Sequence, residues 1–203
     1  MPLITCEMRW LLDGPLPEEA LRWFDDGRPP AAPAWREDRY LPPGGADVGI
    51  KEREGRLEIK GRLAALGTHA ITPEIEGRAE RWCKWTCGPT VAESFRGDAA
   101  IVVGKGRVQK HFLLEPGGLA QATAQRDIAR RGFSLELTRI RLAGDDHWSL
   151  GIEAVPDDPA LLADLLRALA DLLQGFPLPL PRSRSQSYPR WLLNQENARR
   201  GGR

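Results

Sequence analysis

The sequence predicts an α+β fold in which antiparallel strands carry one apolar and one ionic face and helices cover the apolar face. Three observations predict it. The stretch Val48–Arg62 alternates apolar and charged residues on both sides of a Glu54-Gly55 turn, which is typical of a β-hairpin. The segments 4–12 and 133–155 repeat this alternation. A leucine-rich helix that ends at Gly175 then needs an apolar surface to cover.

The composition is that of one globular domain. The chain has 203 residues, 41% of them hydrophobic and 28% charged, which is enough for a substantial core. The formal net charge of +1 excludes bulk electrostatic attraction to nucleic acid or to an anionic membrane. We therefore expect neither as a partner, and leave a homodimer open. The first residues, MPLITCEMRW, carry charges where a secretory signal needs an apolar run, so we expect a cytoplasmic protein.

Cysteine and histidine give no sign of a metal centre or of a hydrolase triad. Cys6, Cys83 and Cys87 are odd in number and lack metal-binding spacing, so we expect reduced residues in the core or the wall of the sheet. The three histidines lie far apart in the sequence, without a zinc or nucleophile motif. Chemistry is therefore expected from carboxylates and basic side chains.

The hairpin at Val48–Arg62 predicts a surface that attracts anions. A two-residue loop places Lys51 opposite Glu58 and Arg53 opposite Arg56. Like cations about 5 Å apart repel by roughly 3 kcal/mol at an effective dielectric of 20, so this face needs water or an anion. The apolar face holds Val48, Ile50, Leu57 and Ile59, and the ionic face holds Lys51, Arg53, Glu58, Lys60 and Arg62.

The N-terminal part predicts a strand, a short helix and a second extended piece. Ile4–Leu12 alternates as a strand, with Thr5, Glu7 and Arg9 on its polar face. The segment 15–26 predicts a helix with its acids near the start, where the helix dipole favours them. A further extended piece covers 35–41.

The middle of the chain predicts a connection, a strand, a hairpin and a helix. Residues 67–77 contain Pro73 and are expected to connect the central hairpin to a strand at 78–87, both faces of which are mixed, so the inward face stays open. The segments 99–103 and 107–115 predict a hairpin that turns through Gly104-Lys105-Gly106. Residues 119–131 predict a helix that stops at Gly132.

The C-terminal part predicts a third hairpin, a helix and a tail. The hairpin spans 133–155, and the leucine-rich helix follows it with Asp157 or Asp158 as its cap. From residue 176 the proline-rich chain is expected to be extended and to wrap on the domain, and 189–200 predicts a short helix with Trp191 docked.

The charged faces fit either an open sheet with a wet side or a closed barrel with a polar lumen. In a lumen, basic side chains need carboxylates, metal ions or a polyanion to remain charged. Carboxylates such as those of Glu7, Glu58, Glu136 and Glu153 suit Mg²⁺ or Mn²⁺. Mixed acids and bases of this kind favour phosphoryl chemistry.

Several segments together resemble one known family. They are the first strand and helix, the triplet Asp38-Arg39-Tyr40, the successive GIKERE and LEIKGR, and the late pair LELTRIRLAGDDHWSLGIEA from Leu135 to Ala154. Over about Ile4 to Leu173 the chain resembles the CYTH, or triphosphate tunnel metalloenzyme, superfamily. The resemblance implies that residues 1–175 form an antiparallel β-barrel, a tunnel with helices packed on the outside, and that residues 176–203 form the wrapping tail.

The resemblance also implies a function and a set of site residues. It implies a hydrolase of inorganic triphosphate, nucleoside triphosphates or other organic phosphates that uses Mg²⁺ or Mn²⁺. The implied catalytic residues are Glu136 and Glu153, the metal ligands Glu7, Glu136 and Glu153, and the phosphate-binding residues Arg9, Lys51, Arg53, Lys60, Arg62 and Lys84.

The first strand departs from the family signature. Where the family has Glu-x-Glu-x-Lys, this chain reads Thr5-Cys6-Glu7-Met8-Arg9, so the first carboxylate is absent and arginine replaces lysine. This leaves open a tunnel that binds polyphosphate or nucleotide without catalysis. A third alternative is an interaction domain, in which some of the seven tryptophans contact a partner.

Overall fold

The computed structural model describes residues 2–26, 35–88, 100–115, 118–122, 131–155 and 161–201. Its strands are β1 (Leu3–Asp13), β2 (Trp35–Tyr40), β3 (Val48–Arg53), β4 (Arg56–Thr72), β5 (Ile75–Cys87), β6 (Ile101–Glu115), β7 (Gly118–Ala122), β8 (Gly132–Leu142) and β9 (Asp145–Val155). Its helices are α1 (Glu18–Phe24), α3 (Leu161–Leu173), the short 3-10 helix η2 (Arg182–Arg184) and α4 (Tyr188–Gly201).

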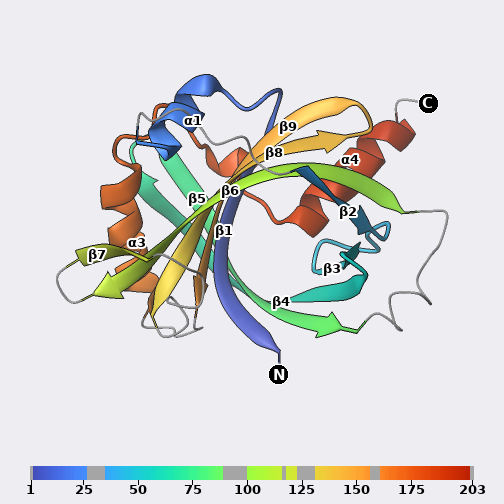
Figure 1. Ribbon diagram of the computed structural model, residues 1–203, viewed down its shortest axis with the longest axis horizontal. Helices are drawn as coiled ribbons and strands as arrows, with labels where there is room; N and C mark the ends of the chain where they lie inside the picture. The colour runs from blue at the N-terminus through green and yellow to red at the C-terminus, as the bar shows by residue number, and fades with distance from the viewer. Residues whose placement is uncertain are drawn as a thin grey trace.

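The strands close into an antiparallel barrel, which confirms the predicted fold class and excludes the open sheet. The strand order is β2-β3-β4-β5-β1-β9-β8-β6, and β2 also pairs with β6, so eight described strands complete the ring. β7 continues from the edge of β6 outside the ring. Figure 1 shows the strands crossing around the lumen, with α1 and α3 on one side of the molecule and α4 at the other.

The central hairpin has the predicted register and turn. Lys51 lies opposite Glu58 and Arg53 opposite Arg56. Glu54 and Gly55 both have positive φ, 51° and 71°, as the tight turn of a twisted hairpin requires. The ionic face points into the lumen, whereas the apolar face points outward, where Val48 is 49% exposed.

Two expected breaks between strands are wrong, because the strands continue through them. β4 runs on to Thr72, and Thr72 pairs with Ile75 across a turn that contains Pro73. β6 is likewise continuous through the Gly104-Lys105-Gly106 segment. Gly104 is therefore not a turn residue, and a Cβ there would meet the ring of Trp35 at an ordinary contact distance of 3.6 Å.

The helix expected at 119–131 is also wrong where the structure describes it. Residues 118–122 form β7, which pairs with the last residues of β6. β2 pairs with β6 only from Ile101 to Gly106. Without β7, the N–H and C=O groups at the other end of the same edge of β6 would be unpaired. Residues 123–130 lie outside the described part of the chain.

The remaining elements follow the predictions. β1, α1, β2, β5, β8, β9, α3 and α4 occur where the alternation and helical periodicity indicate. The expected caps of α3, Asp157 and Asp158, lie outside the described residues. None of the three cysteines forms a disulfide within the described part of the chain, and Cys6 and Cys83 are buried.

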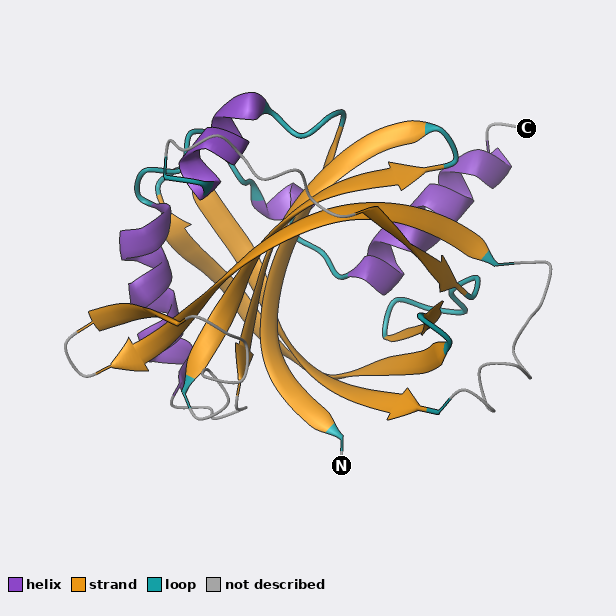
Figure 2. Ribbon diagram, viewed as in Figure 1, coloured by secondary structure: helices purple, strands orange, loops and turns teal. Residues whose placement is uncertain are grey.

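The main hydrophobic core lies outside the barrel, between its wall and the helices (Figure 2). The outward face of β1 supplies Met8 and Trp10, which are 3% and 0% exposed. α1 and α3 pack there through Leu21, Phe24 and Leu169 among others. The apolar stripe of α3 therefore covers the barrel wall, as its leucine spacing requires.

The C-terminal segment completes the wall and then closes one end of the lumen. Ser185 bridges to Trp10, and the N–H of Gln186 donates to the Arg9 carbonyl at 2.9 Å. α4 then packs Trp191 against a second core made of lumen-facing residues from four strands. These lumen-facing residues are Leu11, Tyr40, Val103, Ile140 and Leu142. The C-terminal segment therefore both contributes to the barrel wall and packs against residues inside the barrel.

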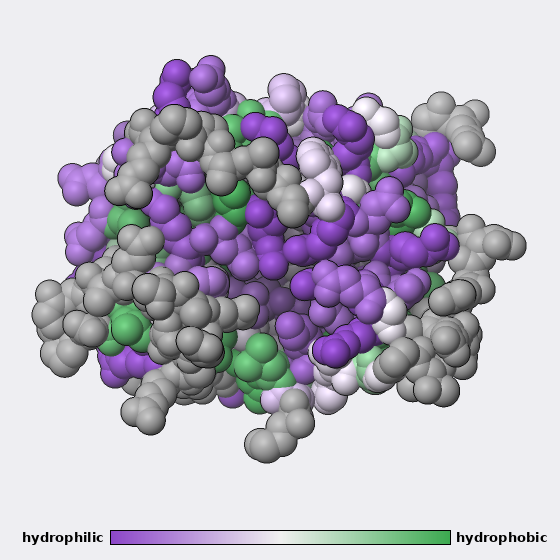
Figure 3. Space-filling model, in the orientation of Figure 1, coloured by the Kyte–Doolittle hydropathy of each residue, from purple (hydrophilic) through white to green (hydrophobic). Residues whose placement is uncertain are grey.

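On the face seen in Figure 3, hydrophilic side chains predominate across the middle of the molecule and apolar ones occur in small separate groups. Within the described residues, no helix is both long and apolar enough to cross a membrane.

Candidate functional site

The lumen contains a cavity of about 150 Å³ that is lined mainly by charged side chains. The basic residues that line it are Arg9, Arg36, Lys51, Arg53, Lys60, Arg78, Lys84, Lys105 and Arg107. The acidic ones are Glu7, Glu58, Glu80, Glu136 and Glu153. Nine basic against five acidic side chains leave the cavity with an excess of positive charge.

Strand alternation explains why these residues meet. Each barrel strand turns every second side chain inward, so residues far apart in sequence share one lumen. Of the predicted phosphate-binding residues, Arg9, Lys51, Arg53, Lys60 and Lys84 line this cavity. Arg62 does not line it, since its guanidinium pairs with Asp47 and, at 3.2 Å, with Glu80. The open question about β5 is resolved, because Glu80, Trp82 and Lys84 form its inward face.

Glu136 sits at the centre of an arginine clamp. Its two carboxylate oxygens accept hydrogen bonds from Arg9 and from Arg107, each at 3.0 Å. Gln109 and Thr138 add further hydrogen bonds at 3.2 and 3.1 Å. Burial alone would raise the pKa of Glu136, but Arg9 and Arg107 outweigh it and hold the pKa well below its usual range.

A row of three glutamates crosses the neighbouring strands. In the sheet register Glu7 lies opposite Glu80 on β5 and opposite Glu153 on β9. The Thr5 hydroxyl donates to Glu7 at 2.6 Å, and Lys60 forms an ion pair with the same oxygen. Burial, and then the charge of Glu7, raises the pKa of Glu153. The Glu7 and Glu153 pair therefore attracts a further cation.

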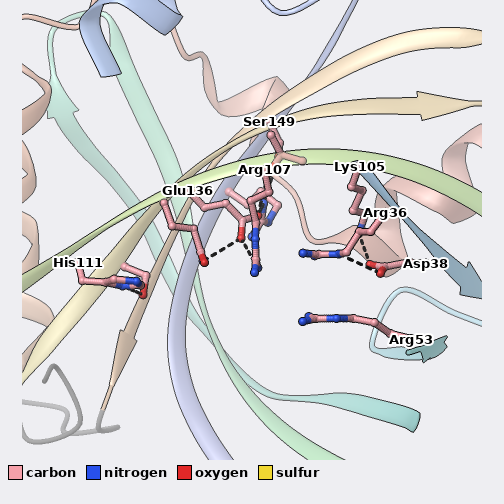
Figure 4. Close-up of polar contacts among 12 residues, drawn as sticks. Arg36, Asp38, Arg53, Lys105, Arg107, His111, Glu136 and Ser149 are labelled. Atoms are coloured by element: carbon pink, nitrogen blue, oxygen red, sulfur yellow. Dashed lines mark hydrogen bonds and ion pairs between the residues drawn. The ribbon is translucent and has the colours of Figure 1, made fainter. Parts of the chain in front are cut away.

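A second polar cluster surrounds Asp38 near the α4 end (Figure 4). Its buried carboxylate accepts from Lys105 at 2.9 Å and from Lys51 at 3.0 Å. Lys105 also lies 2.6 Å from the Tyr40 hydroxyl. Burial, followed by repulsion from Lys51, lowers the pKa of Lys105 from 10.5 to about 7 despite the nearby Asp38.

Tyr188 of α4 forms the floor of the cavity. Lys105 lies 3.8 Å and Arg9 5.2 Å from the centroid of its ring. Such cation-aromatic contacts position both cations without neutralising them. The buried Tyr188 hydroxyl has no hydrogen-bond partner of ordinary geometry in the described part of the chain.

Sequence reasoning missed Arg36, Arg78 and Tyr188 as site residues. Arg36 shares its strand face with Asp38 and Tyr40, and Arg78 shares its face with Glu80, so alternation could have found both. Tyr188 had no local signal, because only the path of the tail brings it into the lumen. Figure 4 shows Arg36 and Arg53, which come from different strands, extending in the same direction.

The predicted metal ligands divide into two groups. Glu136 is occupied by its clamp, whereas Glu7 and Glu153 are directly opposed across one strand pair. Among the described residues, no group of three or more histidine, cysteine, aspartate or glutamate side chains is close enough to hold a metal ion. Mg²⁺ is often held by one or two carboxylates together with substrate phosphates. The Glu7 and Glu153 pair fits that donor set, and Glu136 does not.

No protein-family model matches the chain, and a search of curated proteins finds no match.

Proposed function

We propose that the chain is a phosphohydrolase that binds inorganic triphosphate or a nucleoside triphosphate in the barrel lumen and hydrolyses it with Mg²⁺ or Mn²⁺. One observation supports this proposal above the others. The cavity has an excess of basic side chains and one closed end, and the opposed carboxylates of Glu7 and Glu153 lie in its wall. Basic groups suit the phosphate oxygens, and carboxylates suit the divalent cation that accompanies them.

The chain's own residues would bind and orient the phosphate chain. Arg9 and Arg107 are held in place by Glu136 and present their remaining N–H groups to the cavity. Lys84 makes no ion pair within the described residues and lines the same cavity, so it is free to contact phosphate. Low solvent access strengthens each of these contacts.

Glu7 and Glu153 would hold the divalent cation. When bound, the cation would neutralise charge on the phosphate oxygens and lower the pKa of a coordinated water. Lys60, which now pairs with Glu7, would then be released towards phosphate. Burial and the neighbouring Glu7 raise the pKa of Glu153, and a cation bound between the two carboxylates would lower it again.

A second candidate function is binding without hydrolysis. It is favoured by Thr5, which stands where the family signature has a carboxylate and donates a hydrogen bond to Glu7. Lys60 already supplies a positive charge at Glu7. In this alternative the cavity holds the same anions and needs no divalent cation.

Phosphate release from inorganic triphosphate, measured with Mg²⁺, Mn²⁺ or EDTA, separates the two functions. For a hydrolase we expect release that depends on the metal and that Glu153→Gln abolishes. The matched control is Glu74→Gln, which removes the same charge from an exposed position in the β4–β5 turn.

Calorimetric binding of triphosphate in EDTA completes the test. Metal-independent binding without release in any metal would favour the second candidate. If wild type shows neither phosphate release nor triphosphate binding, both candidate functions are contradicted. Glu153→Gln should also raise the melting temperature, because it removes a buried carboxylate that lies beside Glu7. A melting temperature at or above that of wild type would show that the variant loses activity without unfolding.

A further inference from the structure

A second opening lies where the α4 end of the lumen meets the β4–β5 pair. It is a cavity of about 270 Å³, lined by Arg62, Ala65, Gly67, Thr68, Arg78, Ala79, Glu80, Gln186 and Arg190. The pairing of β4 with β5 shifts register between Arg62 and Ala64 and again between Ala65 and Thr68. These bulges bend β4 locally and leave room beside the first residues of the tail. We call this cavity the side window.

The side window is contiguous with the lumen. Arg78, Glu80 and Gln186 line both cavities. Glu80 is also one end of the glutamate row that contains Glu7 and Glu153. A phosphate chain seated at this row would therefore lie next to the side window.

The side window has unmatched positive charge. Arg62 is balanced by Asp47 and Glu80. Arg78 and Arg190, in contrast, form no ion pair with any described residue, although both line the cavity. The two guanidinium groups come from β5 and α4. The Arg78 N–H donates to the Ser185 hydroxyl at 2.8 Å, which holds the segment before α4 against β5. The window is therefore built to receive an oxyanion.

We propose that Arg62, Arg78 and Arg190 form a second oxyanion subsite, which holds the outer phosphate of a linear phosphate chain longer than triphosphate. The inference rests on the proposed function, since the inner phosphates of that chain occupy the lumen. The lining of the window favours a phosphate chain over a nucleoside. It contains small residues and arginines and no aromatic ring, whereas a base needs a ring on which to stack.

Calorimetric titration with inorganic triphosphate and with a defined longer linear polyphosphate tests the proposal. Wild type is compared with Arg78→Gln/Arg190→Gln. A longer chain binds more tightly for statistical reasons alone, but that factor is the same in both proteins. We expect the affinity gain from triphosphate to the longer chain to fall about tenfold in the double variant. Arg190→Gln alone, which changes a side-window residue that does not line the lumen cavity, should keep its triphosphate affinity within about twofold of wild type.

The control variant is Arg182→Gln/Arg200→Gln, which removes the same charge from two exposed arginines outside both cavities. This control variant should show the same affinity gain from triphosphate to the longer polyphosphate as wild type. If the double variant unfolds, Arg190→Gln alone is used. The affinity gain for the longer chain should then fall by about half as much, on a logarithmic scale, as expected for the double variant. Melting temperatures verify that each variant is folded.

Three results would overturn the proposal. An unchanged affinity gain in Arg78→Gln/Arg190→Gln would contradict the phosphate subsite in the side window and leave the proposed function intact. Loss of triphosphate binding in folded Arg190→Gln would place this arginine in the lumen site. Absence of triphosphate binding to wild type would contradict the proposed function and this inference with it.

Discussion

Gly151 lies directly opposite Arg9 in the pairing of β1 with β9, and a Cβ on Gly151 would lie 2.6 Å from the guanidinium carbon of Arg9. Glu136 on β8 is the partner of Gly151 on its other side. Arg9 therefore reaches Glu136 by lying across the bare backbone of Gly151. The absence of a side chain at this one position allows the arginine clamp to form.

Gly151→Ala should disrupt the clamp. The methyl group would displace the guanidinium group of Arg9, because real Cβ contacts are never so short. We expect a loss of about 1 to 3 kcal/mol of stability, typical of overpacking, and a clear loss of triphosphate affinity. Urea unfolding and calorimetry measure the two effects. Gly45→Ala is the control, since a Cβ there meets nothing within 4 Å; equal effects in both variants would contradict the clamp.

Glu136→Gln should leave Arg9 and Arg107 without a counter-charge. Loss of one partner of a buried ion pair typically costs about 3 to 5 kcal/mol. The folded-state pKa of Glu136 is depressed, so its contribution is complete above the ordinary carboxyl pKa and is lost as pH falls towards the folded value. Urea unfolding should show wild type losing stability below about pH 4.5, with a flatter profile in the variant. Parallel profiles would refute this role of Glu136.

Lys105 should give a pH dependence of the same sign, but in the alkaline range. Its folded-state pKa is about 7 against an ordinary 10.5, so between these values the unfolded chain binds more protons and stability rises with pH. The contribution is about 1.4 kcal/mol per pH unit at its steepest. Lys105→Met should remove this slope in chemical unfolding between pH 7 and 10. A slope that survives in the variant must come from another group.

Trp191→Ala should open the closed end of the barrel. Trp191 is 2% exposed and packs against lumen-facing residues such as Leu11 and Ile140. Truncation of a buried tryptophan typically costs about 3 to 5 kcal/mol. Urea unfolding of this variant beside Asn197→Ala, an exposed position of α4, measures the difference. Equal stability of the two variants would show that α4 does not seal the lumen.

Strand alternation carried most of the predictions that the structure confirms. The register of Lys51 with Glu58, the inward row of β1 and the last hairpin all follow from a period of two in the side chains. The same period could have found Arg36 and Arg78. The helix predicted over residues 119–131 failed over residues 119–122, because pairing with the free edge of β6 outweighed local helical preference.

Features that depend on tertiary approach had no local signal. The glycines around Lys105 read as a turn, yet they lie within the continuous strand β6. Tyr188 enters the lumen only because the tail fills the gap beside Arg9 and Arg78. The clamp on Glu136 requires three strands to meet at Gly151. None of these distances can be read from periodicity or composition.

The most direct test of the central claim, that the lumen binds a phosphate chain, is calorimetric titration of wild type and Lys84→Gln with inorganic triphosphate in EDTA. Lys84 lines the cavity without an ion pair among the described residues, so its substitution leaves the salt bridges in place. The account predicts saturable binding to wild type, about tenfold weaker in the variant, with Arg182→Gln unchanged. Absence of binding to wild type, or equal affinity in wild type and Lys84→Gln, would contradict it.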